Sequence, residues 1–351
     1  MKYQLSNLKY HLPKFSLFLT SNKITMKKYA CLLVFALFLN GCDDGDLKVD
    51  TIDFDDPSIT GQTCNPLTNG LIYKIKSQES LLIQLPDNTL LNDATIKGTP
   101  ITYDINNSTY RVVYRAYNGA VTTPNICGSI PPTTPSVTEE WQALGGQIVI
   151  NSVENEETNT TDGSSKITGY THNIVFNNIT FAKPSGNQVE ADFDFGDFKT
   201  TYTSPNVTFL NPLQQCPVSR QIYNFTTTSA LTIDNIDKDL IDNKETNGTP
   251  RTGLINTTTN KVVLRTYING TLTQAYFCGT TIPSAPAVGE QWIAANGVEG
   301  ESGIIQVTTT KLLNVYTHTI VLKNVKLVKG NSSFKLATNY VLGNLEVVTA
   351  P

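Results

Sequence analysis

Hydrophobic and polar positions alternate with a period of two through most of the chain after residue 60. In YTHNIVF (170–176) the tyrosine, histidine, isoleucine and phenylalanine fall on one face, and the polar residues between them fall on the other. RVVYRAY (111–117) is β-branched and aromatic, and INNSTY (105–110) before it supplies a hairpin turn. No segment carries a convincing apolar stripe of helical period. The pattern predicts strands near 71–77, 80–86, 100–105, 110–117, 146–153, 168–182 and 190–199.

The same stretch of chain contains an internal duplication. GTPITYDINNSTYRVVYRAYNG (98–119) matches GTPRTGLINTTTNKVVLRTYING (248–270), and YTHNIVFNNITFAK (170–183) matches YTHTIVLKNVKLVK (316–329). Short turns between neighbouring strands imply antiparallel pairing. The predicted fold is therefore all-β, with two tandem homologous antiparallel β-sandwich-like domains at 60–205 and 206–351; a small barrel is the second choice of closure.

The N-terminal region has the layout of an export signal. Two lysines follow Met26, and an apolar run of eleven residues covers 29–39. That run is too short for a membrane-spanning helix, which needs roughly 20 residues, but it suits the hydrophobic region of a signal peptide. Residues 1–25 are then expected to be an extension from an upstream start codon or an unusually long basic region.

The segment that follows, Leu39-Asn40-Gly41-Cys42, resembles the lipobox of bacterial lipoproteins. The resemblance implies a signal peptide at 1–41, cleavage before Cys42, and a palmitate-type lipid on its thiol. The alternative is an ordinary signal peptide with a chance cysteine.

An acidic tether is expected at 42–59. An acidic stretch beside the lipidated cysteine is similar to the surface-export signal of Bacteroidota lipoproteins, whereas in enteric bacteria an aspartate directly after the cysteine retains the protein at the inner membrane. The chain thus resembles flavobacterial-type outer-membrane lipoproteins. This implies lipid anchoring in the outer membrane at the cell surface, with the periplasmic face as the alternative.

The cysteine count predicts two disulfides. Six cysteines become four once Cys31 leaves with the signal and Cys42 carries lipid. Four cysteines allow three pairings, and a duplicated fold most simply closes each loop within its own copy. An exported chain meets an oxidising compartment, so disulfides are expected. A four-cysteine metal site is the alternative, but no Cys-x-x-Cys knuckle occurs. The predicted pairs are Cys64–Cys127 and Cys216–Cys278.

Charge narrows the range of partners. Residues 1–41 hold six of the 26 basic residues and none of the 30 acidic ones, so the rest carries 20 basic against 30 acidic groups. Such a chain repels phosphate backbones, which makes nucleic acid an unexpected partner. The membrane, through the lipid, and a glycan or envelope protein are the partners we expect. No cofactor is implied.

Several matched polar or aromatic residues are candidates for chemistry. His172 and His318 fall on the apolar strand face, so a core histidine bonded to a carbonyl or a tyrosine is favoured over a catalyst or metal ligand. Trp141 and Trp292 are expected to pack beside a disulfide rather than to stack on sugars.

A second matched set combines charges with these tryptophans. Arg115 and Arg265 are expected to pair with Glu139 and Glu290 across a sheet edge; a carboxylate-binding pocket is the alternative. Together the arginines and tryptophans form the candidate binding set Arg115, Arg265, Trp141 and Trp292.

Recognisable catalytic and metal motifs are missing from the sequence. DFDFGDF (192–198) and DNIDKDLIDNKE (234–245) lack the EF-hand spacing, so solvated acidic segments are favoured over calcium sites. No nucleophile elbow, P-loop, dinucleotide fingerprint or zinc-protease motif occurs. We expect no catalytic residue and no metal, and favour a non-catalytic envelope protein. A glycan-acting or glycan-binding accessory and a structural component of an envelope assembly are the alternatives.

Overall fold

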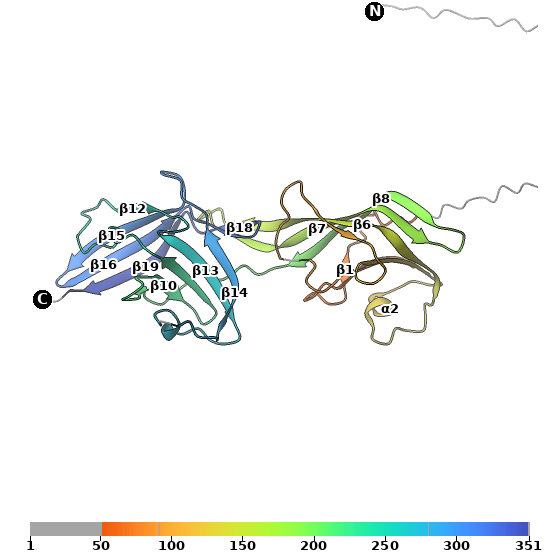
Figure 1. The fold of residues 1–351 in the computed structure, drawn as a ribbon, viewed down its shortest axis with the longest axis horizontal. Coiled ribbons are helices and arrows are strands. Elements are labelled where there is room, and N and C mark those ends of the chain that lie inside the picture. The colour runs from red at the N-terminus through yellow and green to blue at the C-terminus, as the bar shows by residue number, and fades with distance from the viewer. Residues whose placement is uncertain (1–50, 91, 280, 350–351) are drawn as a thin grey trace, which may run out of the picture. The chain divides into compact units, whose positions relative to one another are not determined.

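β-Strands make up nearly all the regular structure in residues 51–349, the part that this computed structural model describes, apart from residues 91 and 280. We call the described residues up to 205 the first half and those from 206 the second half. The first half forms an eight-stranded antiparallel sheet in the order β1-β2-β3-β5-β6-β7-β8, with β4 paired to β6 (Figure 1). A short helix, α2 (Thr123–Cys127), follows β5. The strands are β1 (Gln62–Thr63), β2 (Leu71–Lys76), β3 (Glu79–Gln84), β4 (Ile101–Asp104), β5 (Arg111–Tyr117), β6 (Val137–Thr158), β7 (Ser165–Ala182) and β8 (Gln188–Thr201).

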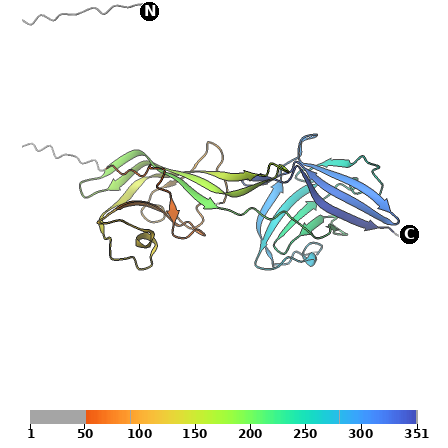
Figure 2. The same cartoon turned by 180° about the vertical axis from the view of Figure 1, so that it is seen from behind.

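The second half contains two antiparallel sheets. The larger has the order β18-β17-β14-β13-β11-β10-β9 and the smaller β12-β15-β16-β19. Both belong to the part of the ribbon that runs from green to blue in Figure 2. A 3-10 turn, η1 (Gln274–Tyr276), follows β13. The strands are β9 (Gln214–Gln215), β10 (Ile222–Phe225), β11 (Ser229–Asp234), β12 (Arg251–Leu254), β13 (Lys261–Ile268), β14 (Ala287–Ala294), β15 (Ile304–Leu312), β16 (Val315–Lys323), β17 (Lys326–Lys329), β18 (Ser332–Lys335) and β19 (Asn339–Val348).

The long strand β6 changes partner along its length. Its first part pairs with β5 and its later part with β4, and the register against β7 shifts between Ala143 and Gln147. Gly146 lies at this shift with φ +111°, and a Cβ there would be 2.7 Å from Ile179 Cα. Only glycine tolerates that backbone and that approach. In the second half, β14 and β15 are separate strands that pair with β13 and β12 respectively.

The two halves repeat the same local geometry. Trp141 lies opposite Tyr114 on β5, and Trp292 lies opposite Leu264 on β13. A bulge next to Gly196 in β8 recurs next to Gly343 in β19. Residues 53–351 belong to one compact unit. The division into domains at 205/206 therefore stays a prediction, although the recurring registers are what a duplication would produce.

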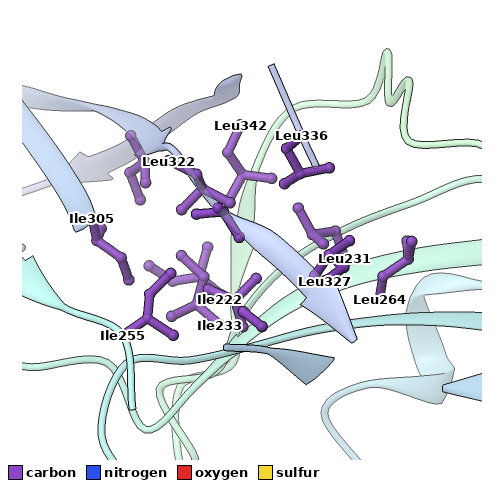
Figure 3. Packing of buried hydrophobic residues seen from close by; sticks show 14 of the residues in the cluster. Ile222, Leu231, Ile233, Ile255, Leu264, Ile305, Leu322, Leu327, Leu336 and Leu342 are labelled. Atoms are coloured by element: carbon purple, nitrogen blue, oxygen red, sulfur yellow. The ribbon is translucent and has the colours of Figure 1, made fainter. Parts of the chain in front are cut away.

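The core of the second half lies between its two sheets. Ile222, Ile233 and Leu264 from the larger sheet meet Ile305 and Leu322 from the smaller one, and all are at most 1% exposed (Figure 3). Ile167 and Tyr170, near the start of β7 in the first half, belong to the same buried cluster. Burying such side chains stabilises by roughly 1.5–3 kcal/mol each.

The core of the first half is more aromatic. Phe176 lies 5.6 Å from Phe193 and 6.4 Å from Phe195, measured between ring centroids. The phenylalanines that alternate with acids in DFDFGDF therefore face inward, as expected of a strand.

The predicted all-β antiparallel, sandwich-like class is confirmed, and every predicted strand is present. The sequence pattern did not reveal β1 or the start of β6 at Val137. The proposed signal peptide at 1–41, Cys42 and the acidic tether up to residue 50 lie outside the described residues. No helix within 51–349 is long and apolar enough to span a membrane.

Candidate functional site

Both predicted disulfides are present. Cys64 bonds to Cys127 and Cys216 to Cys278, with Cα–Cα distances of 5.3 and 5.2 Å. Each bridge ties the start of its half to the segment after the strand that carries the matched arginine. Closing a loop of this length stabilises by about 4 kcal/mol in the chain-entropy model.

The matched histidines are buried and bonded to hydroxyl or amide groups. His172 Nδ1 lies 2.7 Å from Ser152 Oγ, and Nε2 lies 3.1 Å from Thr200 Oγ1. His318 likewise contacts a hydroxyl through Nδ1, Thr309 Oγ1 at 2.8 Å, but its Nε2 meets an amide oxygen, Asn243 Oδ1 at 3.1 Å. The partners are thus not the carbonyl or tyrosine that the sequence suggested.

A serine beside a histidine invites a catalytic reading, but the geometry gives it little support. Ser152 is 5% exposed and His172 is fully buried. Burial lowers the pKa of His172 to about 4, so the ring is neutral at pH 7 and a weak base. Its far nitrogen meets a hydroxyl, whereas the triad arrangement orients that ring with a carboxylate. The pair therefore serves as a hydrogen-bonded core group.

The matched tryptophans are also buried, at 2% exposure for Trp141 and none for Trp292. Trp141 lies 4.5 Å from the ring of Tyr114, and the Lys183 ammonium sits 4.2 Å from its centroid. Neither indole offers an open face to a sugar. The expected packing beside a disulfide is not found: Trp141 is not in the cluster around Cys64 and Cys127, and Trp292 lies in the buried cluster between the two sheets of the second half.

The expected pairing of Arg115 and Arg265 with Glu139 and Glu290 is wrong. Arg115 Nε donates to Glu140 Oε2 at 2.7 Å. Glu139 instead accepts a hydrogen bond from the Trp141 indole, because alternate residues of β6 share a face.

Arg265 departs from the expectation in the same way. It donates to Gln291 at 2.9 Å and lies 3.8 Å from Asp234, while Glu290 takes the Trp292 indole N–H at 3.4 Å. The side chains of the two arginines are 31% and 20% exposed and are engaged within their own sheets, so they outline no carboxylate pocket.

Around Glu290 the two halves meet. Tyr202, just after β8, donates to Glu290 Oε2 at 2.6 Å, and Lys329 Nζ lies 2.6 Å from Oε1. Burial by itself would raise the pKa of this carboxyl, but Lys329, Tyr202 and the indole outweigh it and hold the pKa below its ordinary value. The sequence did not single out Tyr202, which lies outside the matched segments.

A second set of contacts between the halves involves Asp93. Its carboxylate accepts from Asn331 N at 3.0 Å and from Ser332 Oγ at 2.8 Å. Nearby, Ser333 N donates to Glu154 Oε2 at 2.9 Å. We call these contacts, together with those of Tyr202, the junction.

A cavity of about 560 Å³ in the first half has several charged residues in its lining. We call it the seam pocket. It opens between the entry segment (residues 53–61), β2 and the bulged part of β8. Its charged lining consists of Asp55, Asp56, Lys74, Asp194, Asp197 and Lys199.

Lys74 forms part of the lining and is only 5% exposed. It shares a strand face with Ile72, which is fully buried, so the pattern of β2 turns this lysine toward the core. Its ammonium donates to the Phe54 carbonyl at 3.1 Å and lies 5.3 Å from the Phe195 ring centroid. Burial lowers the pKa of Lys74, and nearby aspartates offset part of that shift.

The sequence analysis did not pick out Lys74. The available signal was a lysine at an inward position of a predicted strand, where the second copy has Asn224. That contrast becomes meaningful only once the matching registers of Tyr73 and Tyr223 are known.

A larger groove of about 690 Å³ lies beside the junction, but its polar groups are mostly engaged. Ser165 Oγ accepts from Lys335 N, and Ser204 Oγ bonds to the backbone of Ile167. Among the described residues no three His, Cys, Asp or Glu side chains stand close enough to hold a metal ion.

Comparisons with protein families, with curated proteins and with solved structures found no match for this chain. The candidate site therefore rests on its own geometry. That geometry combines a buried cation, a rim of carboxylates and an open cavity, which suits binding of a small polar group.

Proposed function

We propose that this chain is a lipid-anchored protein of the bacterial outer membrane that faces outward and binds a ligand or partner through its β-sandwich halves. The observation that carries the proposal is the lipobox-like segment ending in Cys42, directly followed by an acidic stretch. A single acyl group holds a protein at a membrane only weakly, and stable anchoring needs a second membrane signal. In bacterial lipoproteins the diacylglyceryl group on the cysteine supplies two acyl chains at once.

The structure supports export of the chain. Two disulfides close inside the two halves, and such bonds persist in oxidising compartments outside the cytosol.

The entry segment supports a fixed connection between tether and sheet. Phe54 is fully buried, and Lys76 Nζ donates to the Asp53 carbonyl at 2.7 Å. The last part of the tether predicted at 42–59 is therefore bound to β2 through Asp53 and Phe54 and is not a free spacer.

A binding role fits the site better than a catalytic one. The buried histidines are neutral and enclosed, whereas the seam pocket is open and carries charged groups. Ligand pockets combine a cavity of about 300–1,000 Å³ with a few placed polar groups, as this one does.

Acylation is tested by growing cells with an alkyne analogue of palmitate. We expect labelled protein in the membrane fraction, and loss of both label and membrane retention in Cys42→Ser. Cys31→Ser is the matched control, because Cys31 is expected to leave with the signal peptide. A wild-type protein without acyl mass, or a labelled Cys42→Ser, would contradict the anchor.

Orientation is tested by adding protease to intact cells. We expect the acylated protein to be degraded while a periplasmic marker survives. Replacing the first three aspartates after Cys42 by asparagine should lower surface exposure without changing acylation. Full protection in intact cells would place the protein on the periplasmic face instead.

A further inference from the structure

The seam pocket exists because the two halves fill equivalent seams differently. In the first half, a Cβ added to Gly196 at the bulge would lie 3.3 Å from Lys74 Nζ. In the second half, a Cβ at the equivalent Gly343 would meet the Leu213 side chain at 3.1 Å. Leu213 is 5% exposed and belongs to the buried cluster, so an apolar side chain fills this seam. The first half places a charged group there.

In the second half the equivalent strand position carries a neutral amide instead: Asn224 Nδ2 donates to the Asn211 carbonyl at 2.7 Å, in the segment before β9. Burying an ammonium costs more than burying an amide unless further partners satisfy it. Within residues 51–349 the Phe54 carbonyl is the only hydrogen-bond acceptor of Lys74, although an ammonium has three N–H groups. With the Phe195 ring facing the ammonium at 5.3 Å, at least one N–H is left for a ligand.

The charges around the pocket restrict what that ligand can be. Four carboxylates line it against two ammonium groups, so an anion is repelled overall. A simple cation gains from the carboxylates but meets the buried Lys74 charge and Lys199. The carboxylates need donors and Lys74 needs acceptors.

A hydroxyl group supplies both roles, since it donates one proton and accepts through two lone pairs. Pro57 and Ile59, on the same wall, add apolar surface against which C–H groups can pack. A ring that carries several hydroxyls and no net charge matches every part of this lining.

We propose that the seam pocket binds a neutral polyhydroxyl ligand, a sugar unit of a glycan. Lys74 donates to ligand oxygens, and the carboxylates of Asp55 and Asp194 accept from ligand hydroxyls. This inference deepens the proposed binding function. It rests on one part of that proposal, namely that the chain binds a ligand. Lipid anchoring is tested by acylation, so the two can fail separately.

The test uses the full chain extracted in detergent and applied to an array of neutral and sialylated glycans. Titration calorimetry on the best neutral glycan then compares variants. Lys74→Asn places the residue of the second half at this position, removes the ammonium, and is expected to weaken binding at least tenfold. Lys97→Asn is the matched control, because Lys97 is an exposed lysine of the same half that does not line the pocket, and the affinity of this variant should stay within twofold.

A second variant protects the test against misfolding. Asp194→Asn changes an exposed rim residue and should weaken binding severalfold while the unfolding temperature stays unchanged. Capture of no neutral glycan overturns the proposal. Three other results would also overturn the proposal. They are an unchanged affinity in both pocket variants, preferential capture of sialylated glycans, and displacement of the bound glycan by free glycine or lysine.

Discussion

Single buried polar side chains set much of the chemistry of this protein. His172 and His318 each bridge two neighbours inside the core, and burial lowers the pKa of both. Because the hydroxyl and amide partners hold the neutral ring, these residues link strands without carrying charge. They therefore make folding stability depend on pH.

We expect stability to fall as the pH drops from about 6.5 to about 4. An unfolded histidine binds its proton near pH 6.5, but His172 does so near pH 4, so the unfolded chain binds more protons between these values. The loss amounts to about 3 kcal/mol for His172. Urea unfolding at pH 7, 5.5 and 4 measures it. His172→Asn should flatten the slope, and an unchanged slope would contradict the assignment.

The carboxylate of Glu290 forms a hydrogen bond between the two halves. Its counterpart in the first half, Glu139, is exposed. We expect Glu290→Gln to destabilise by about 2 kcal/mol, because Lys329 and Tyr202 lose a charged acceptor in a partly buried place. Glu139→Gln should cost less than about 0.5 kcal/mol, as surface substitutions do. Chemical unfolding of both variants decides; equal losses would show that the junction contact adds nothing.

At the scale of elements, the register shift between β6 and β7 depends on one glycine. Gly146→Ala is expected to destabilise by about 3 kcal/mol, because its Cβ meets backbone atoms of Asn178 and Ile179 and its φ is positive. Gly145→Ala is the control, since no atom lies within 4 Å of its Cβ. Thermal unfolding compares the two. A Gly146→Ala variant as stable as the control would mean that the strand can shift there at little cost.

The bulge in β8 is a second element that the strand pattern alone does not reveal. It opens room at Gly196 for Lys74, and the same bulge in β19 admits Leu213. One repeated backbone feature thus supports a charged seam in one half and an apolar seam in the other. The local sequence of each seam decides which.

At the scale of the whole molecule, the junction joins the halves. Ile167 and Tyr170 enter the core of the second half, and Asp93 accepts three hydrogen bonds around the β17–β18 turn and its own loop. Halves linked in this way should unfold together rather than as independent modules.

Calorimetry of the wild-type chain should therefore show one transition. We expect Asp93→Ala to separate it into two or to lower its temperature by several degrees, because the backbone N–H of Asn331 loses its partner. Asp239→Ala, in an exposed loop of the second half, is the control and should leave the transition unchanged. Two transitions in the wild-type protein would show that the junction is too weak to couple the halves.

The sequence alone determined the all-β class, most strand positions of the first half and both disulfides. The alternation of apolar and polar residues and the repeated cysteine spacing can both be read directly from the sequence. A duplicated chain favours the same disulfide closure in each copy. The roles of Lys74, Tyr202 and Asp93 were decided by the tertiary structure. Their partners lie up to 239 residues away, and whether a lysine in a strand faces water or a cavity depends on what fills the seam above it. The pairing of Arg115 with Glu140 instead of Glu139 was likewise a matter of register, which composition and spacing do not encode.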